Sequence, residues 1–273
     1  MQALPARCSQ RSTGFAHDVE GIVNTTSFAR DKGAAPLAGK VAVITGGGRG
    51  IGRAIAHAYA DAGAAVVVAA RSSEELDAVV RSIEARGGKA LACRVDVTDY
   101  ANVEAMYAQA VEHFGGVDIV LANAGLGTPG GPIETANLDV WKRTFEVNLY
   151  GALHTARAAI APLRKRGGGK IIMTGSGSRH RPMPGLSAYA TSKLALWMLT
   201  QTIALEVQDA NISVNELIPG PVRTEMTGFG KVAFPPGEWM KEPEDVVPLA
   251  MFLATQPLVG PTAQSFSLMR RAG

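Results

Sequence analysis

From residue 41 onward, short apolar runs alternate with longer stretches in which apolar residues recur at helical spacing. The first two runs, Val41–Thr45 and Ala65–Ala70, are apolar almost throughout, without the alternation of a half-exposed strand. Such runs are typical of a parallel sheet that helices cover on both faces. The pattern predicts strands near 41–45, 65–70, 89–95, 118–122, 170–175 and 212–218, a short last strand near 264–268, and helices in the intervals.

This alternation of strands and helices predicts one α/β domain, a Rossmann-type doubly wound sheet of about seven mainly parallel strands with helices on both faces. Because the crossovers between parallel strands are right-handed, few other topologies are open. Ligands of such sheets bind beyond the carboxyl ends of the strands. We therefore expect the functional residues where the predicted strands end.

The first 36 residues differ from the rest, since they mix Ser, Thr, Arg and Gly without sustained periodicity. Asp18, Glu20 and Asp31 depart from the acid-poor composition of a transit peptide, and no secretory apolar core follows the first basic residue. We expect residues 1–36 to form a flexible N-terminal extension, or one that packs on a neighbouring subunit, and residues 37–273 to form the catalytic domain.

Composition narrows the classes of function. Twenty-seven basic and 24 acidic residues give a formal charge of +3, and no long basic block suggests nucleic acid binding. No uninterrupted apolar run approaches the roughly 20 residues that span a bilayer, which argues against a membrane protein. Cys8 and Cys93 are too few for a disulfide framework or a metal cluster, so we expect no metal site and a cytoplasmic location.

A glycine-rich turn follows the first predicted strand and leads into a helical stretch. Glycines at such a turn let the backbone approach a pyrophosphate closely, and the helix N-terminus favours the anion. The general G-x-G-x-x-G fingerprint fails here, because Ile51 stands where glycine or alanine is needed. The spacing that fits is T-G-x-x-x-G-x-G, carried by Thr45, Gly46, Gly50 and Gly52.

The end of the second predicted strand indicates which dinucleotide would bind. NAD enzymes usually place a carboxylate there, on the 2′-hydroxyl of the adenosine ribose, whereas this strand ends in Arg71. Arg71 and the loop residue Arg49 would both suit a 2′-phosphate. The sequence therefore predicts NADP(H) in preference to NAD(H). If the two arginines merely cap a solvated rim, NAD(H) would also be accepted.

A tyrosine and a lysine stand four positions apart at the start of a long apolar helix, as Tyr189 and Lys193. This spacing places both side chains on one helix face, about 6 Å apart along the axis. A free tyrosine has a pKa of about 10, so it needs a nearby cation to exchange protons near neutral pH. The pair alone is also compatible with an ordinary solvated helix face.

Together these motifs resemble those of the short-chain dehydrogenase/reductase family, in the same order and over about residues 40 to 260. The resemblance implies that Tyr189 transfers the proton, that Lys193 assists it and holds the nicotinamide ribose, and that Ser176 polarises the substrate carbonyl. Ser178 is the main rival of Ser176, which is preferred because its spacing to the tyrosine matches the family. Asn148 matches the family asparagine that holds a proton-relay water at a kink in a helix.

The resemblance also implies a cofactor site. Asp96 would contact the adenine amino group, Asn123 would lie where the backbone passes the cofactor, and Val222 and Thr224 would contact the nicotinamide carboxamide. Ala122 departs from the common N-N-A-G form of the Asn123 motif. The full predicted set is Thr45, Gly46, Arg49, Gly50, Ile51, Gly52, Arg71, Asp96, Val97, Asn123, Tyr189, Lys193, Pro219, Gly220, Val222 and Thr224.

These expectations define an NADP(H)-dependent oxidoreductase that interconverts a carbonyl and a secondary alcohol. The substrate would be a 3-oxoacyl thioester on an acyl-carrier protein or, alternatively, a small ketone, sugar or steroid alcohol. A catalytically silent NADP-binding regulator is the other alternative. Helical stretches around 138–165 and 188–208 resemble those that build family oligomers, so we expect a homodimer or homotetramer.

Overall fold

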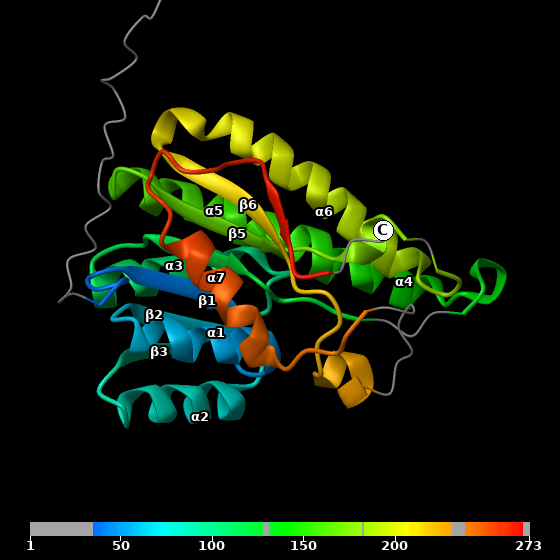
Figure 1. Cartoon of the computed structure of the whole chain (residues 1–273), viewed down its shortest axis with the longest axis horizontal. Coiled ribbons are helices and arrows are strands. Elements are labelled where there is room, and N and C mark those ends of the chain that lie inside the picture. Colours follow the sequence, from blue (N-terminus) through cyan, green and yellow to red (C-terminus); the bar gives the residue numbers. More distant parts are fainter. Residues whose placement is uncertain (1–34, 128–130, 182, 231–237, 270–273) are drawn as a thin grey trace, which may run out of the picture. The chain divides into compact units, whose positions relative to one another are not determined.

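Seven parallel strands form one sheet in the order β3-β2-β1-β4-β5-β6-β7 within the part of the chain that the structure describes (Figure 1). The structure is a computed structural model and describes residues 35–127, 131–181, 183–230 and 238–269. Every strand pairing is parallel. The strands are β1 (Val41–Thr45), β2 (Ala65–Ala70), β3 (Lys89–Arg94), β4 (Ile119–Ala122), β5 (Gly169–Thr174), β6 (Ile212–Ile218) and β7 (Ser265–Ser267). The predicted single-domain doubly wound sheet is confirmed.

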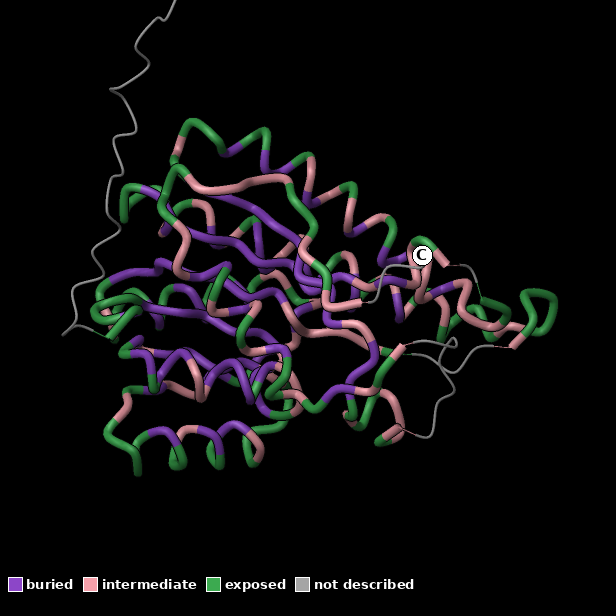
Figure 2. Tube along the Cα trace, in the orientation of Figure 1, coloured by how far each residue is buried: buried purple, intermediate pink, exposed green. Residues whose placement is uncertain are grey.

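Helices cover both faces of this sheet, which explains why its central strands β1, β2 and β4 are almost entirely apolar. The helices are α1 (Gly50–Asp61), α2 (Ser73–Glu84), α3 (Tyr100–Phe114), α4 (Leu138–Phe145), α5 (Gly151–Lys165), α6 (Ser187–Glu206) and α7 (Val247–Ala254). Apolar residues of α1, α2 and α7 pack in one core with Ala42 and Ile44 of β1. Residues of α3, α5 and α6 pack in a second core with Val43. The central strands and the inward helix faces are buried, while the outer helix faces are exposed (Figure 2).

The strand order reverses between β1 and β4, and their carboxyl ends are joined there by Asn123. Its side-chain amide donates to the carbonyl oxygens of Thr45 at 3.1 Å and Gly46 at 3.2 Å. Its backbone N–H donates to Oγ1 of Thr45 at 3.1 Å. The topological switch point, where doubly wound sheets bind ligands, is therefore fixed by hydrogen bonds between two predicted site residues and the glycine turn.

The helical stretch predicted at 138–165 is not one regular helix. Between α4 and α5 the backbone forms a π-helix, η2 (Glu146–Tyr150), and Asn148 lies at its centre. Single π-helical turns inside α-helices are frequent at functional sites. Five 3-10 helices complete the described secondary structure: η1 (Ile133–Thr135), η3 (Gly177–Arg179), η4 (Gln208–Ala210), η5 (Glu225–Gly230) and η6 (Pro243–Val246).

The predicted N-terminal extension falls on residues 1–36, of which 1–34 lie outside the described residues. The division between extension and catalytic domain stays a prediction. Leu37 is buried, and its N–H donates to the carbonyl oxygen of Ala62 at 2.8 Å, so the folded core includes the segment just before β1. Among the described residues, no helix combines the length and the apolar character that crossing a membrane requires.

Candidate active site

The glycine turn after β1 folds tightly on itself. Gly46 and Gly50 have φ angles of 66° and 53°, a region that favours glycine. A Cβ atom at Gly52 would overlap the carbonyl oxygen of Gly46, so glycine is required there for a close backbone approach. The helix that follows, α1, has no acidic residue in its first turn and no side-chain cap. Its free N–H groups and dipole are therefore available to an anion such as a pyrophosphate.

A pocket of about 840 Å³ opens beside this turn and collects most of the predicted cofactor residues. Its wall includes nine of the predicted set, namely Gly46, Arg49, Gly50, Ile51, Arg71, Asp96, Val97, Asn123 and Thr224. Thr45, at the end of β1, and Gly52, in α1, are not part of the wall, and Pro219, Gly220 and Val222, which follow β6, also lie outside it. The volume and the glycine cradle fit a dinucleotide. The wall also contains Glu75, Arg143, Glu225 and Met226, which the motifs did not single out.

At one end of the pocket, Asp96 is held by an arginine from another helix. Its carboxylate accepts hydrogen bonds from the N–H and Oγ1 of Thr98, at 3.0 and 2.7 Å, and lies 3.2 Å from Nη2 of Arg143 on α4. Burial acts to raise the pKa of Asp96, but the Thr98 hydrogen bonds and the Arg143 guanidinium outweigh it and lower that pKa. The carboxylate is thus ionised and oriented for hydrogen bonding, as the adenine-binding prediction requires.

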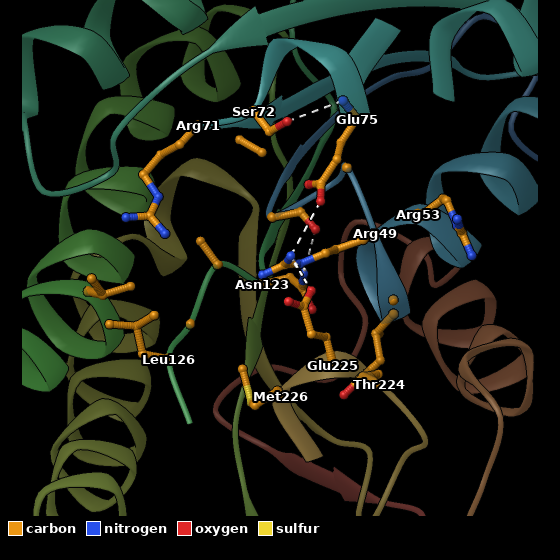
Figure 3. Close-up of a pocket in the computed structure, with 18 of the residues that line it drawn as sticks. Arg49, Arg53, Arg71, Ser72, Glu75, Asn123, Leu126, Thr224, Glu225 and Met226 are labelled. Atoms are coloured by element: carbon orange, nitrogen blue, oxygen red, sulfur yellow. Dashed lines mark hydrogen bonds and ion pairs between the residues drawn. The ribbon is translucent and has the colours of Figure 1, made fainter. Parts of the chain in front are cut away.

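Arg49 lies between two carboxylates on the pocket wall (Figure 3). Its Nη1 atom is 3.3 Å from Oε1 of Glu75 on α2, and it also forms an ion pair with Glu225 of η5. Arg71 also lines this pocket and is the first residue after β2. The two predicted arginines therefore line the same pocket. The acidic partners of Arg49 come from elements that motif spacing does not relate to the glycine turn.

The segment after β6 comes back against the glycine turn. The backbones of Val222 and Lys241 form a parallel β-bridge, and Val222 is buried. The Cγ2 atom of Thr224 lies 3.2 Å from where a Cβ at Gly50 would be. The predicted nicotinamide-binding segment and the predicted pyrophosphate turn are therefore in contact, although they lie far apart in the sequence.

Ser176 and Tyr189 meet at the carboxyl end of β5. Tyr189 lies in the first turn of α6, and a side-chain hydrogen bond with Ser176 acts to lower its pKa. Burial acts more strongly in the opposite direction, so the pKa of Tyr189 is raised in the free protein. The rival Ser178 uses its Oγ to donate to Oγ of Ser176 at 3.0 Å. This geometry favours Ser176 over Ser178 as the partner of the tyrosine.

Lys193 lies one helical turn after Tyr189 and is buried. Its Nζ atom donates to the carbonyl oxygen of Thr174 at 2.8 Å and lies 5.9 Å from the centre of the Tyr189 ring. Burial lowers the pKa of Lys193 to about 8, while the carboxylate of Glu216 acts to raise it. The lysine is therefore mainly a cation at neutral pH, and a cation near a phenol favours the phenolate.

Asn148 connects α6 to the pocket wall. Its side chain is fully buried, with Oδ1 accepting from the N–H of Leu126 at 2.7 Å and Nδ2 donating to the carbonyl oxygen of Leu126 at 3.0 Å. Nδ2 also lies 3.1 Å from Oγ of Ser192 on α6. Leu126 lines the pocket, whereas Ser176, Tyr189 and Lys193 lie beyond its wall. Asn148 is the hydrogen-bonded link between the two predicted halves of the site.

Comparison with known proteins identifies the family to which this chain is similar. The family model described as short chain dehydrogenase matches residues 40–231. The human dehydrogenase/reductase SDR family member 4 is 34% identical over 230 residues, which cover 81% of this chain and 83% of that protein. The chain also resembles the glycine betaine reductase ATRR of Emericella nidulans, at 33% identity, but spans only 18% of that protein's length.

Solved structures share the fold and much of the length. A short-chain type dehydrogenase/reductase from Mycobacterium marinum superposes with a TM-score of 0.77 at 37% identity, covering 85% of this chain and 94% of that one. A 7α-hydroxysteroid dehydrogenase complexed with NADH and 7-oxo glycochenodeoxycholic acid gives a TM-score of 0.77 at 31% identity. That likeness covers 85% of this chain and 93% of the other.

Proposed function

The chain belongs to the short-chain dehydrogenase/reductase family, and we propose that within it this protein is an NADP(H)-dependent enzyme interconverting a carbonyl and a secondary alcohol. Family membership makes it an oxidoreductase that acts on CH–OH groups with NAD(P). The observation that carries the proposal is the buried Lys193 ammonium, 5.9 Å from the centre of the Tyr189 ring, together with Ser176, which acts to lower the pKa of Tyr189. A regulator without turnover would not need these three groups together.

In the proposed mechanism the side chains manage the proton and the developing charge. When bound, the nicotinamide supplies or accepts the hydride. Tyr189 gives its phenolic proton to the carbonyl oxygen, and the Ser176 hydroxyl donates a hydrogen bond to the same oxygen. Lys193 stabilises the phenolate that remains. Asn148, held in a fixed position, orients the proton relay through which Tyr189 regains its proton. Alcohol oxidation uses the same groups in the opposite direction.

The preference for NADP(H) is supported by the two guanidinium groups, of Arg49 and Arg71, on the pocket wall, and by the fact that an arginine, not a carboxylate, is the first residue after β2. A planar guanidinium holds a phosphate through two hydrogen bonds, which the 2′-hydroxyl of NAD(H) does not offer. The relative complexed with NADH is a reason to measure both cofactors side by side.

Two substrate classes remain. A 3-oxoacyl thioester on an acyl-carrier protein is the first, and a small ketone, sugar or steroid alcohol is the second. The likeness to a hydroxysteroid dehydrogenase bound to a 7-oxo bile acid favours including oxo- and hydroxysteroids in any test. The expected cytoplasmic location and homo-oligomeric state stay predictions.

The test is a spectrophotometric screen of these substrates with NADPH and NADH, in both directions. Tyr189→Phe, which removes one hydroxyl, should lower kcat by roughly 10²- to 10⁴-fold while cofactor binding is retained. The matched control is Tyr150→Phe, since Tyr150 is exposed and the substitution is the same. NADPH binding without turnover across the panel would favour the silent regulator. Equal kcat/KM with NADH would overturn the cofactor preference alone.

A further inference from the structure

Arg49, which the proposed function assigns to the 2′-phosphate, is already engaged by two carboxylates. Glu75 and Glu225 lie on opposite sides of its guanidinium (Figure 3). Glu225 belongs to the segment after β6, whereas Glu75 belongs to the first turn of α2, directly after the end of β2. An anion that takes Arg49 as a ligand must therefore compete with these carboxylates.

Glu75 stands where the glycine turn meets the end of β2. A Cβ atom at Gly48 would lie 3.0 Å from Oε2 of Glu75 and 3.7 Å from the Cβ of Ala70. The N–H of Glu75 donates to Oγ of Ser72 at 3.3 Å, which caps α2 and fixes the first turn that carries the glutamate. Doubly wound folds bind the adenosine ribose in this region. The carboxylate of Glu75 therefore lies where the 2′-hydroxyl of NAD(H) or the 2′-phosphate of NADP(H) would bind.

Resting on the proposed function, we propose that Glu75 sets the ratio of NADP(H) to NAD(H) affinity in this protein. Its carboxylate holds Arg49 away from a 2′-phosphate and repels the phosphate directly, whereas a 2′-hydroxyl can donate a hydrogen bond to it. Arg49 and Arg71 favour the phosphorylated cofactor, and Glu75 limits that preference. The preference for NADP(H) over NAD(H) is therefore weaker than the two arginines alone would produce.

The test measures binding of two nucleotides that lack the nicotinamide, adenosine 2′,5′-bisphosphate and AMP, by calorimetry on the full chain at low ionic strength. Glu75→Gln should bind the bisphosphate about tenfold more tightly than the wild type, because one nearby negative charge is removed. Its affinity for AMP should stay within about twofold, since AMP carries no 2′-phosphate. The matched control is Glu74→Gln, which removes the same charge from the same helical turn at an exposed position.

Unchanged or weaker binding of the bisphosphate to Glu75→Gln would overturn the inference. An equal gain in Glu74→Gln would also overturn it, because the effect would then come from overall charge. Because neither probe can be turned over, a protein without reductase activity can still give the expected result. Failure of the wild type to bind either nucleotide would overturn both this inference and the cofactor assignment.

Discussion

Arg179 and Glu216 form a buried ion pair, with Nη2 and Oε2 2.9 Å apart and side chains 4% and 0% exposed. Glu216 lies in the middle of β6, and Arg179 ends η3 just after Ser176. Both side chains hydrogen bond to Oγ of Ser265 on β7, and the Arg179 guanidinium lies 5.0 Å from the Trp197 ring centre. The pair therefore joins the serine loop to the edge of the sheet.

Breaking this pair from one side should destabilise the protein strongly. Arg179→Met leaves the carboxylate of Glu216 buried without its cation, and removing one partner of a buried pair typically costs about 3 to 5 kcal/mol. The double variant Arg179→Met with Glu216→Leu should regain most of that loss, because neither charge is then left buried. Urea unfolding of the three proteins measures these differences.

The control is the exposed pair of Arg223 and Glu242, whose Nε and Oε1 atoms are 2.8 Å apart with side chains about half exposed. Glu242→Gln should change the free energy of unfolding by less than about 1 kcal/mol. If Arg179→Met costs no more than Glu242→Gln, the buried pair does not hold the serine loop to the sheet.

The pH dependence of carbonyl reduction should follow Lys193. Burial lowers its folded pKa to about 8, so the ammonium is present below that pH and is lost as the pH rises through it. Because reduction needs both the Tyr189 proton and a cation to stabilise the resulting phenolate, kcat/KM should fall above about pH 8. A profile of kcat/KM from pH 6 to 10, recorded with saturating cofactor, measures this decrease, which forms the alkaline limb of the profile.

Glu216→Gln provides a directional check on that profile. The Glu216 carboxylate acts to raise the pKa of Lys193, so removing its charge should move the alkaline limb to lower pH. Glu242→Gln, at an exposed position, should leave the limb where it is. A limb that stays in place in Glu216→Gln, in protein shown by circular dichroism to be folded, would contradict the assignment of the limb to Lys193.

The sheet and the motif-bearing side chains were predictable from the sequence because they depend on local patterns. Apolar runs define the strands, the glycine spacing defines the turn, and the i, i+4 spacing of Tyr189 and Lys193 defines a shared helix face. These features need no knowledge of which helix packs against which strand. The predicted strand positions accordingly agree with the structure to within one or two residues.

Residues that act through tertiary pairing were missed. Glu75 and Arg143 look like ordinary charges on exposed helix faces, and their importance arises only when α2 and α4 bring them to Arg49 and Asp96. Glu216 is the charged residue of β6, a strand predicted to be buried, and a buried charge requires a partner that the sequence does not identify. Sequence spacing carries no information about such pairs, because their members come from separate elements of the fold.

Asn148→Ala should impair catalysis and stability together. The substitution leaves the N–H and carbonyl oxygen of Leu126 without their side-chain partner, at a cost of about 1 to 3 kcal/mol. If the asparagine holds the proton path, kcat should also fall by roughly 10²-fold. Asn102→Ala, which removes an exposed side-chain hydrogen bond to Asp99 at the start of α3, is the matched control and should change neither quantity appreciably. A folded Asn148→Ala protein with normal kcat would refute the relay role.

Arg71 should contribute to NADPH binding and little to NADH binding. It lines the pocket at the end of β2, and a guanidinium gains its main advantage from the 2′-phosphate. Arg71→Ala should therefore raise KM for NADPH about tenfold, with KM for NADH within about twofold of the wild type. Arg81→Ala removes the same charge from the last turn of the neighbouring α2 and should leave both values unchanged. Equal losses for the two cofactors in Arg71→Ala would mean that this arginine supports the pocket without reading the phosphate.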